Sequence, residues 1–424
     1  MRIFRANKEY KVKRVKTRTN FIAIFMSFIA CLYMACSDDD SSSSSSDDTS
    51  SGEVSDSEDG TNDDSSGSDA ETVEANSSCD TAGEFAWVEQ GTTYAICEDG
   101  VWVSYEVGSV EYETGFETCK FNYGAAWQAS SSTQEHYDGL DYIAVWLGDN
   151  AYYNSGFEGK MLEMCLTISA TPMIYAYVIA EFGKDMGLVD CDVADDSTHC
   201  THGAEIIRNY FQDSILYRYQ KYAYGFRKRL LEDYEEAYVD TFKTIWLIEP
   251  DYYQYSVSGS EQKLAYDSIE QVNGGIPDSL MGVYFAQIVD TIKTYLPGAK
   301  IAIDISPWIE EPEAWYANFD LDLVDYGSTS GGRTLPGSTK IRSSNDMTWA
   351  GIAELLNRPI MADAGYDAGG AGTGHASAWD VPANINARIE DGVIGVMQMD
   401  AALDYPARVD TIKPQITATI PWCE

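Results

Sequence analysis

Residues 279–305 read SLMGVYFAQIVDTIKTYLPGAKIAIDI. The first part places apolar residues three or four positions apart, as an amphipathic helix does, and Leu296-Pro297-Gly298 ends that pattern. Lys300–Ile305 follows as a short apolar run rich in isoleucine, which predicts a buried β-strand. A helix that leads into a buried strand is half of the repeating unit of an α/β fold.

The same alternation extends along the chain from Lys120 onward. Strands are expected at 121–127, 142–147, 172–178, 244–248, 300–305, 321–324, 359–362 and 393–397. Helices are expected between them, including 156–168, 205–236, 279–296, 312–318, 348–356 and 381–389. Eight such repeats in about 300 residues predict a (β/α)8 TIM-like barrel, or a slightly distorted relative of it, because an open doubly wound sheet usually has fewer strands.

The charge of the chain restricts its partners. Its 424 residues carry 28 Lys and Arg against 68 Asp and Glu, a formal net charge of −40. Because binding to phosphates needs an excess of cations, nucleic acid is excluded as a ligand. The 29 tyrosines and 10 tryptophans favour a neutral ligand that stacks and accepts hydrogen bonds, such as a sugar.

The N-terminal segment has the features of an export signal and a tether. Residues 1–20 contain eight basic side chains and precede an apolar run at 21–35, which is typical of a signal peptide spanning 1–35. Met34-Ala35-Cys36-Ser37 resembles a bacterial lipoprotein cleavage site, with Tyr33 in place of the usual leucine, and this implies lipidation of Cys36. Residues 36–78 are acidic, rich in Ser and Asp, and predict a disordered linker. We therefore expect a protein anchored to the bacterial cell surface or outer membrane only through its lipid, with plain secretion as the alternative.

An exported chain with nine cysteines is expected to form disulfides. Two cysteines bracket a small β unit at 79–107, two close an acidic loop, and two tie the start of the main domain, 108–424, to its end. The expected pairs are Cys79 with Cys97, Cys191 with Cys200, and Cys119 with Cys423, which leaves Cys165 free. His199, Cys200 and His202 do not match a zinc-binding spacing, so neither a metal nor a cofactor is expected.

Acidic residues follow five of the predicted strands. In a barrel, the residues at the carboxyl ends of the strands converge on one mouth, and packing carboxylates together raises at least one pKa. A single such acid is more often a helix cap than a catalyst, but five at one mouth indicate a glycoside-cleaving site with one acid and one base or nucleophile. The candidate catalytic residues are Glu249, Asp251, Asp304, Asp363 and Asp400, and Asp325 also follows a predicted strand.

Aromatic residues lie near the same predicted strand ends and are candidate sugar platforms, although a tryptophan is individually more often part of the core. They are Trp127, Trp146, Tyr177, Tyr252, Trp308, Tyr326, Tyr366 and Trp379. The glycine-rich stretch 369–374 lies among acids that would repel an anion, and it predicts a rim loop rather than a phosphate site.

Thr244–Asp251 ends in Glu-Pro-Asp and resembles the corresponding strand end of glycoside hydrolase family 6, the inverting cellulases. The resemblance extends patchily over 171–404. It implies that Asp251 is the general acid and that Asp304 and Asp363 shape the sugar site. Two departures stand out: the 177–185 segment offers only Glu181 and Asp185, and the family's Lys-Pro-Gly before its last aspartate is missing, which leaves Asp400 or Asp404 as the base.

Two other interpretations compete. Glu249-Pro250 is also similar to the Asn-Glu-Pro signature of retaining barrel glycosidases, with Glu249 as acid/base and Asp363 where a glutamate nucleophile stands. The third is a surface glycan-binding protein on a decayed hydrolase scaffold. The sequence as a whole favours a monomeric cell-surface hydrolase of a β-glucan or related plant polysaccharide, inverting through Asp251.

Overall fold

The computed structural model describes residues 73–80, 85–89, 93–98, 100–106, 115–128, 133–147, 153–191, 198–234, 236–257, 276–365 and 374–423. The predicted signal peptide, Cys36, all of the linker before residue 73, Tyr366 and residues 369–373 lie outside these ranges. None of the helices in the described ranges combines the length and the apolar character that crossing a membrane requires.

The segment predicted as a small β unit contains a three-stranded antiparallel sheet. Its strands are β1 (Phe85–Glu89), β2 (Thr93–Glu98) and β3 (Val101–Glu106). The Cys79–Cys97 disulfide pins the sheet, and Ala95, Cys97 and Trp102 form its small core. A sheet this small buries little apolar surface, so the disulfide supplies a constraint that its core cannot.

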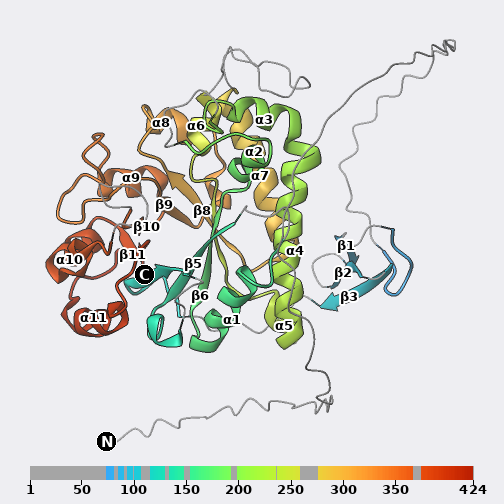
Figure 1. Cartoon of the computed structure of the whole chain (residues 1–424), viewed down its shortest axis with the longest axis horizontal. Coiled ribbons are helices and arrows are strands. Elements are labelled where there is room, and N and C mark those ends of the chain that lie inside the picture. Colours follow the sequence, from blue (N-terminus) through green and yellow to red (C-terminus); the bar gives the residue numbers. More distant parts are fainter. Residues whose placement is uncertain are drawn as a thin grey trace, which may run out of the picture. The chain divides into compact units, whose positions relative to one another are not determined.

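The main domain is a closed barrel of eight parallel strands, which confirms the predicted fold class (Figure 1). Around the barrel the strands follow chain order, and β11 pairs with β4 to close the ring. The strands are β4 (Asn122–Ala126), β5 (Tyr142–Leu147), β6 (Thr171–Ala176), β7 (Ile245–Ile248), β8 (Lys300–Ile305), β9 (Tyr326–Thr329), β10 (Ile360–Asp363) and β11 (Val393–Gln398).

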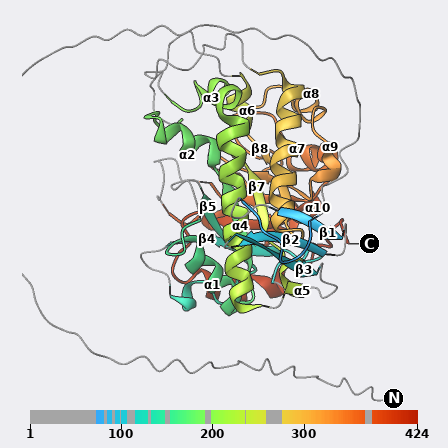
Figure 2. The same ribbon diagram turned by 90° about the vertical axis from the view of Figure 1, so that its right-hand side faces the viewer.

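Helices follow the strands and cover the barrel, and the long helices α4 and α7 pack side by side (Figure 2). The predicted helix at 205–236 is divided by a π-helical turn at Phe211–Ile215. The helices are α1 (Glu158–Ile168), α2 (Val178–Asp185), α3 (Gly203–Tyr210), α4 (Leu216–Asp233), α5 (Glu236–Val239), α6 (Tyr252–Val257), α7 (Asp278–Tyr295), α8 (Pro312–Tyr316), α9 (Trp349–Leu356), α10 (Pro382–Glu390) and α11 (Tyr405–Ile412).

One predicted strand is wrong. Residues 321–323 form a 3-10 helix, which begins where the Asp320 carboxylate accepts a hydrogen bond from the Asp322 amide, and the strand starts only at Tyr326. The Leu-Asp-Leu-Val alternation imitates a half-buried strand, but the side-chain cap favours a turn. Asp325 and Tyr326 therefore lie at the amino end of β9, opposite to the mouth. Asp325 binds Lys300 there at 2.9 Å, and Tyr326 packs against Phe116.

The cysteine predictions are confirmed. Cys119–Cys423 joins the start of the barrel domain to its end, and Cys191–Cys200 closes a loop after α2. Cys165 is free and buried in α1, where burial raises the pKa of its thiol. A buried thiol held neutral is a packing residue rather than a nucleophile.

Candidate active site

Three of the predicted acids meet at the mouth of the barrel. Asp304 and Asp363 lie within β8 and β10 near their carboxyl ends, and Asp251 follows β7. Their charges act on one another: the pKa of Asp304 is raised well above its usual value, first by burial and then by the negative charges of Asp251 and Asp363. The strand ends thus bring together carboxyl groups that are far apart in the sequence.

Asp363 forms a hydrogen bond across the barrel. Tyr175 lies on β6, which is on the opposite side of the closed sheet from β10, and its hydroxyl donates to Oδ2 of Asp363 at 3.2 Å. The Gly365 amide donates to Oδ1 at 2.6 Å. Burial raises the pKa of Asp363 to about 6, although Gly365, Arg342 and Tyr175 lower it in part. Asp363 therefore exchanges its proton close to neutral pH.

The turn after β10 accepts only glycine. Gly365 has a φ of +75°, and a Cβ there would lie 2.1 Å from the Gly332 carbonyl oxygen. The backbone can thus approach closely enough for its amide to reach Asp363.

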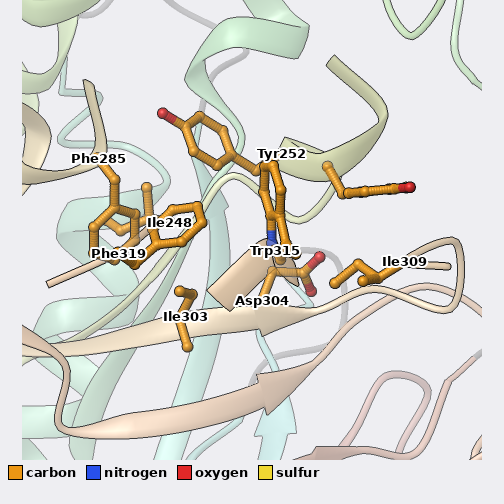
Figure 3. Close-up of a pocket in the computed structure, with 9 residues that line it drawn as sticks. Ile248, Tyr252, Phe285, Ile303, Asp304, Ile309, Trp315 and Phe319 are labelled. Atoms are coloured by element: carbon orange, nitrogen blue, oxygen red, sulfur yellow. The ribbon is translucent and has the colours of Figure 1, made fainter. Parts of the chain in front are cut away.

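Asp304 is held as a neutral acid beside an apolar pocket. The Ser330 hydroxyl is hydrogen-bonded to Oδ1 of Asp304 and to the Pro250 carbonyl oxygen, while Oδ2 is buried and has no hydrogen-bond partner within the described residues. Figure 3 shows the Asp304 carboxyl group among apolar and aromatic side chains. The pocket is lined by Ile248, Tyr252, Tyr253, Phe285, Ile303, Asp304, Ile309, Trp315 and Phe319. An apolar wall disfavours the charged form, which explains the raised pKa.

Arg342 is a buried cation near the acids. Its guanidinium donates to the carbonyl oxygens of Gly331 at 2.8 Å, Ile305 at 3.3 Å and Ser330. Burial lowers its pKa to about 10, and the charges of Asp304 and Asp363 raise it in part. The side chain ties the end of β8 to the loop after β9 and places positive charge beside the cluster.

Glu249 points away from the mouth. It has a φ of +43°, and its side chain is fully buried. Its Oε1 accepts hydrogen bonds from the Ile179 amide at 2.9 Å and from the Tyr219 hydroxyl of α4 at 2.6 Å. Burial raises the pKa of Glu249 to about 8, so it holds its proton at neutral pH. These contacts indicate a structural link between β7, α2 and α4.

Asp251 is the acid in this group that reaches solvent, with 18% of its side chain exposed. Both of its oxygens accept hydrogen bonds: Tyr177 donates to Oδ2, and Gln254 donates to Oδ1 at 2.7 Å. An ionised carboxylate only accepts hydrogen bonds, and this arrangement suits that form. The sequence predicted Asp251 as the proton donor, but its bonding favours an acceptor.

A buried histidine stands behind Tyr177. The Tyr177 hydroxyl lies 2.9 Å from Nε2 of His199, whose side chain is fully buried. Within the described residues, the ligand-type atoms of Cys191, His199, Cys200 and Asp251 lie within 4.8 Å of one another. Because the two cysteines are joined in a disulfide, only an imidazole and a carboxylate remain, and these do not make a zinc site.

The other candidate acids form ion pairs and hydrogen bonds of their own. Asp400 accepts a hydrogen bond from Gln128 at 3.2 Å. Asp404 is 63% exposed and pairs with Arg408 at 2.9 Å, a hydrogen bond that lowers its pKa. On α2, Glu181 pairs with Lys184 and Asp185 with Arg218. These contacts give each of the four acids a nearby polar or charged partner.

The predicted aromatic platforms divide into exposed and buried groups. Trp308 is 58% exposed and free to stack on a ligand. Trp146 is partly buried and packs on Tyr175 with ring centroids 4.6 Å apart, and Trp127 packs on Tyr137. Tyr177 is buried as well, and its hydroxyl contacts His199 and Asp251, so it is not a sugar platform. Three further predictions are wrong because a buried ring cannot stack on a sugar. Trp379 is in the core and donates a hydrogen bond to the Thr334 hydroxyl. The Tyr252 hydroxyl donates to the Met281 carbonyl oxygen, and Tyr326 lies at the opposite end of the barrel.

Sequence reasoning missed Tyr175, Ser330 and Arg342, and considered His199 only as a metal ligand. A signal was present for one of them: Tyr175 lies in a predicted strand, two positions before the candidate Tyr177, although β6 ends at Ala176 and Tyr177 precedes α2. The loop residues Ser330 and Arg342 carry no comparable pattern.

No protein-family model and no curated protein matches this sequence. Among solved structures, a GH26 β-mannanase from Bacteroides ovatus is 10% identical with a TM-score of 0.44, covering 72% of this chain and 92% of that one. A GH26 protein from Muricauda sp. is 9% identical with a TM-score of 0.43, covering 70% and 85%. A Bacillus subtilis mannanase is 10% identical with a TM-score of 0.40, covering 72% and 85%. Because these identities and TM-scores are low, we assign the fold from the strand pairing and describe the site from its own side chains.

Proposed function

We propose that the barrel is a glycoside hydrolase of a β-glucan or a related plant polysaccharide. The observation that carries the proposal is a set of neighbouring carboxyl groups in different surroundings: Asp363 is buried, and Asp251 is partly exposed. Burial raises the pKa of Asp363 to about 6, while Asp251 accepts hydrogen bonds at both oxygens and reaches solvent. In glycoside hydrolases, two carboxyl groups in different surroundings have different pKa values, so that one can act as the acid and the other as the base or nucleophile.

In this proposal Asp363 protonates the leaving oxygen, and Asp251 attacks the sugar or activates water. A general acid works best with a pKa near the working pH, and the pKa of Asp363, raised by burial to about 6, meets this condition. Asp304 then serves as a neutral wall of the site. The roles are the reverse of those implied by the family 6 resemblance, and the anomeric configuration of the first product distinguishes attack from water activation.

The test is release of reducing ends from soluble β-glucans, with a β-mannan assayed in parallel, by the full chain and two variants. Asp251→Asn and Asp363→Asn should each reduce kcat by about a hundredfold or more, as loss of a general acid or base does. Asp404→Asn is the matched control, because Asp404 is exposed and paired with Arg408. Release that survives both cluster substitutions would refute the assignment.

A non-catalytic glycan-binding protein is the second candidate, and one observation favours it. Asp304 and Asp363 are only 4% and 3% exposed, so a substrate reaches Asp363 only if neighbouring groups move. Saturable binding of a glycan by calorimetry, with no reducing ends released over extended incubation, would favour this candidate.

We also propose that Cys36 is lipidated and anchors the protein at the bacterial surface, because a signal-like segment ends at this cysteine. Labelling of producing cells with a fatty acid tests the proposal. Label on the wild type that Cys36→Ser abolishes would support it, and equal labelling of both would reject it.

A further inference from the structure

We propose that His199 is a positioning residue that, through Tyr177, fixes the Asp251 carboxylate, and that the Cys191–Cys200 disulfide holds His199 in place. The inference rests on the proposed function of Asp251. It gives a role to His199, to Tyr177 and to the disulfide, none of which is one of the carboxyl groups proposed to carry out hydrolysis.

The geometry is a chain of three side chains. His199 Nε2 lies 2.9 Å from the Tyr177 hydroxyl, which in turn donates to Oδ2 of Asp251. His199 Nε2 is also 3.8 Å from Oδ2 of Asp251. The Tyr177 and His199 rings meet edge to face with centroids 5.4 Å apart, which fixes their relative orientation.

The direction of the hydrogen bonds follows from what each atom can do. Burial and the nearby charges of Asp251 and Asp190 raise the pKa of Tyr177 well above its usual value, so the phenol keeps its one proton and gives it to Asp251. His199 Nδ1 is buried with no hydrogen-bond partner within the described residues, which places the imidazole proton on Nε2. The imidazole therefore donates to the phenol oxygen, and the phenol donates to the carboxylate.

The loop that carries His199 is held at both of its ends. Cys200, the next residue, is bonded to Cys191, and the His199 amide donates to the Val189 carbonyl at 3.0 Å. Asp190 lies 3.8 Å from His199 Nε2 and pairs with Lys184 at 3.0 Å. The disulfide thus limits the movement of the His199 imidazole, which must stay within hydrogen-bond distance of the Tyr177 hydroxyl to act on it.

A spectroscopic experiment tests the chain without relying on hydrolysis. The protein has only four histidines, so 15N-histidine labelling of the full chain gives a spectrum that single substitutions can assign. His199 should show a protonated Nε2 and a bare Nδ1. Tyr177→Phe should move the His199 Nε2 signal, while Tyr253→Phe, which alters a tyrosine of the apolar pocket, should not. A His199 signal that is unchanged in Tyr177→Phe would overturn the inference.

A kinetic experiment tests the consequence for Asp251. His199→Phe and Tyr177→Phe should lower kcat about tenfold or more with little change in KM, because each removes hydrogen bonding to a charged group. His199→Gln keeps an amide donor near Nε2 and should restore part of kcat. Equal loss in the Phe and Gln variants, or a loss confined to KM, would refute positioning.

The disulfide has a matched control within the chain. Cys191→Ser with Cys200→Ser should lower kcat and broaden the His199 signal, whereas Cys119→Ser with Cys423→Ser removes a different disulfide and should do neither. If the wild type releases no sugar, the proposed hydrolytic function fails, and the histidine spectrum alone decides the positioning inference. If hydrolysis is present and both serine pairs behave alike, the function stands and the role of the disulfide is rejected.

Discussion

Replacing Glu249 by Gln isolates the loss of folding stability that results when an ionisable carboxyl group is buried. Its pKa rises from 4.5 to about 8 in the folded protein. Between these values the unfolded chain releases the proton and the folded chain keeps it, so the folded state binds more protons and its stability falls as pH rises. Each pKa unit corresponds to about 1.4 kcal/mol, which gives a loss of about 5 kcal/mol that is complete above pH 8. Below pH 4.5 this loss is absent.

Gln mimics the protonated side chain, because its carbonyl oxygen can accept from both Ile179 and Tyr219. The free energy of unfolding of Glu249→Gln, measured in urea against that of the wild type, should therefore shift in favour of the variant by about 4 kcal/mol between pH 5 and pH 8. Asp304 and Asp363 are present in both proteins, so their contributions to the pH dependence of the free energy of unfolding largely cancel in the difference.

Glu313→Gln, at an exposed site in α8, is the matched control and should show no such slope. If the difference in free energy of unfolding between the wild type and Glu249→Gln stays constant with pH, the account of Glu249 as a buried neutral acid is refuted.

Glu249→Gln should also retain most of its kcat, because the Glu249 side chain is directed towards α4. A loss of about a hundredfold or more would instead return Glu249 to the acid/base role of a retaining enzyme.

Three further predictions concern the mouth of the barrel. Because Asp363 must be protonated to act as the acid, kcat should fall as pH rises through about 6, and Asp363→Asn should abolish that limb of the pH profile. Gly365→Ala should lower the free energy of unfolding by more than about 2 kcal/mol, measured in urea, because its Cβ would meet the Gly332 carbonyl oxygen and its φ is +75°. Trp308→Ala should weaken binding of long oligosaccharides in calorimetry without changing the midpoint of urea unfolding, because the ring is 58% exposed.

The barrel was predictable because its strands are buried on both sides and stand out as apolar runs between amphipathic helices. The error at 321–324 arose where a capped turn carries the same alternation as a strand. The acids at the strand ends were also predictable, but their roles were not. The protonation of Asp363 depends on burial and on a tyrosine 188 positions away, and that of Glu249 depends on a helix that precedes it by 30 positions. Local sequence patterns contain neither contact.

The turn that ends β7 carries the residues on which both family resemblances depend. Both resemblances use Glu249-Pro250-Asp251, one through the aspartate and one through the glutamate. The positive φ of Glu249 turns its side chain towards Ile179 and Tyr219. Two residues later, Asp251 meets Tyr177 and solvent. A single left-handed residue thus gives two carboxyl groups, two positions apart, different surroundings. Glu249 is buried and ties β7 to its helices, whereas Asp251 is a partly exposed acceptor at the mouth. The backbone conformation distinguishes their roles, and the residue types alone do not.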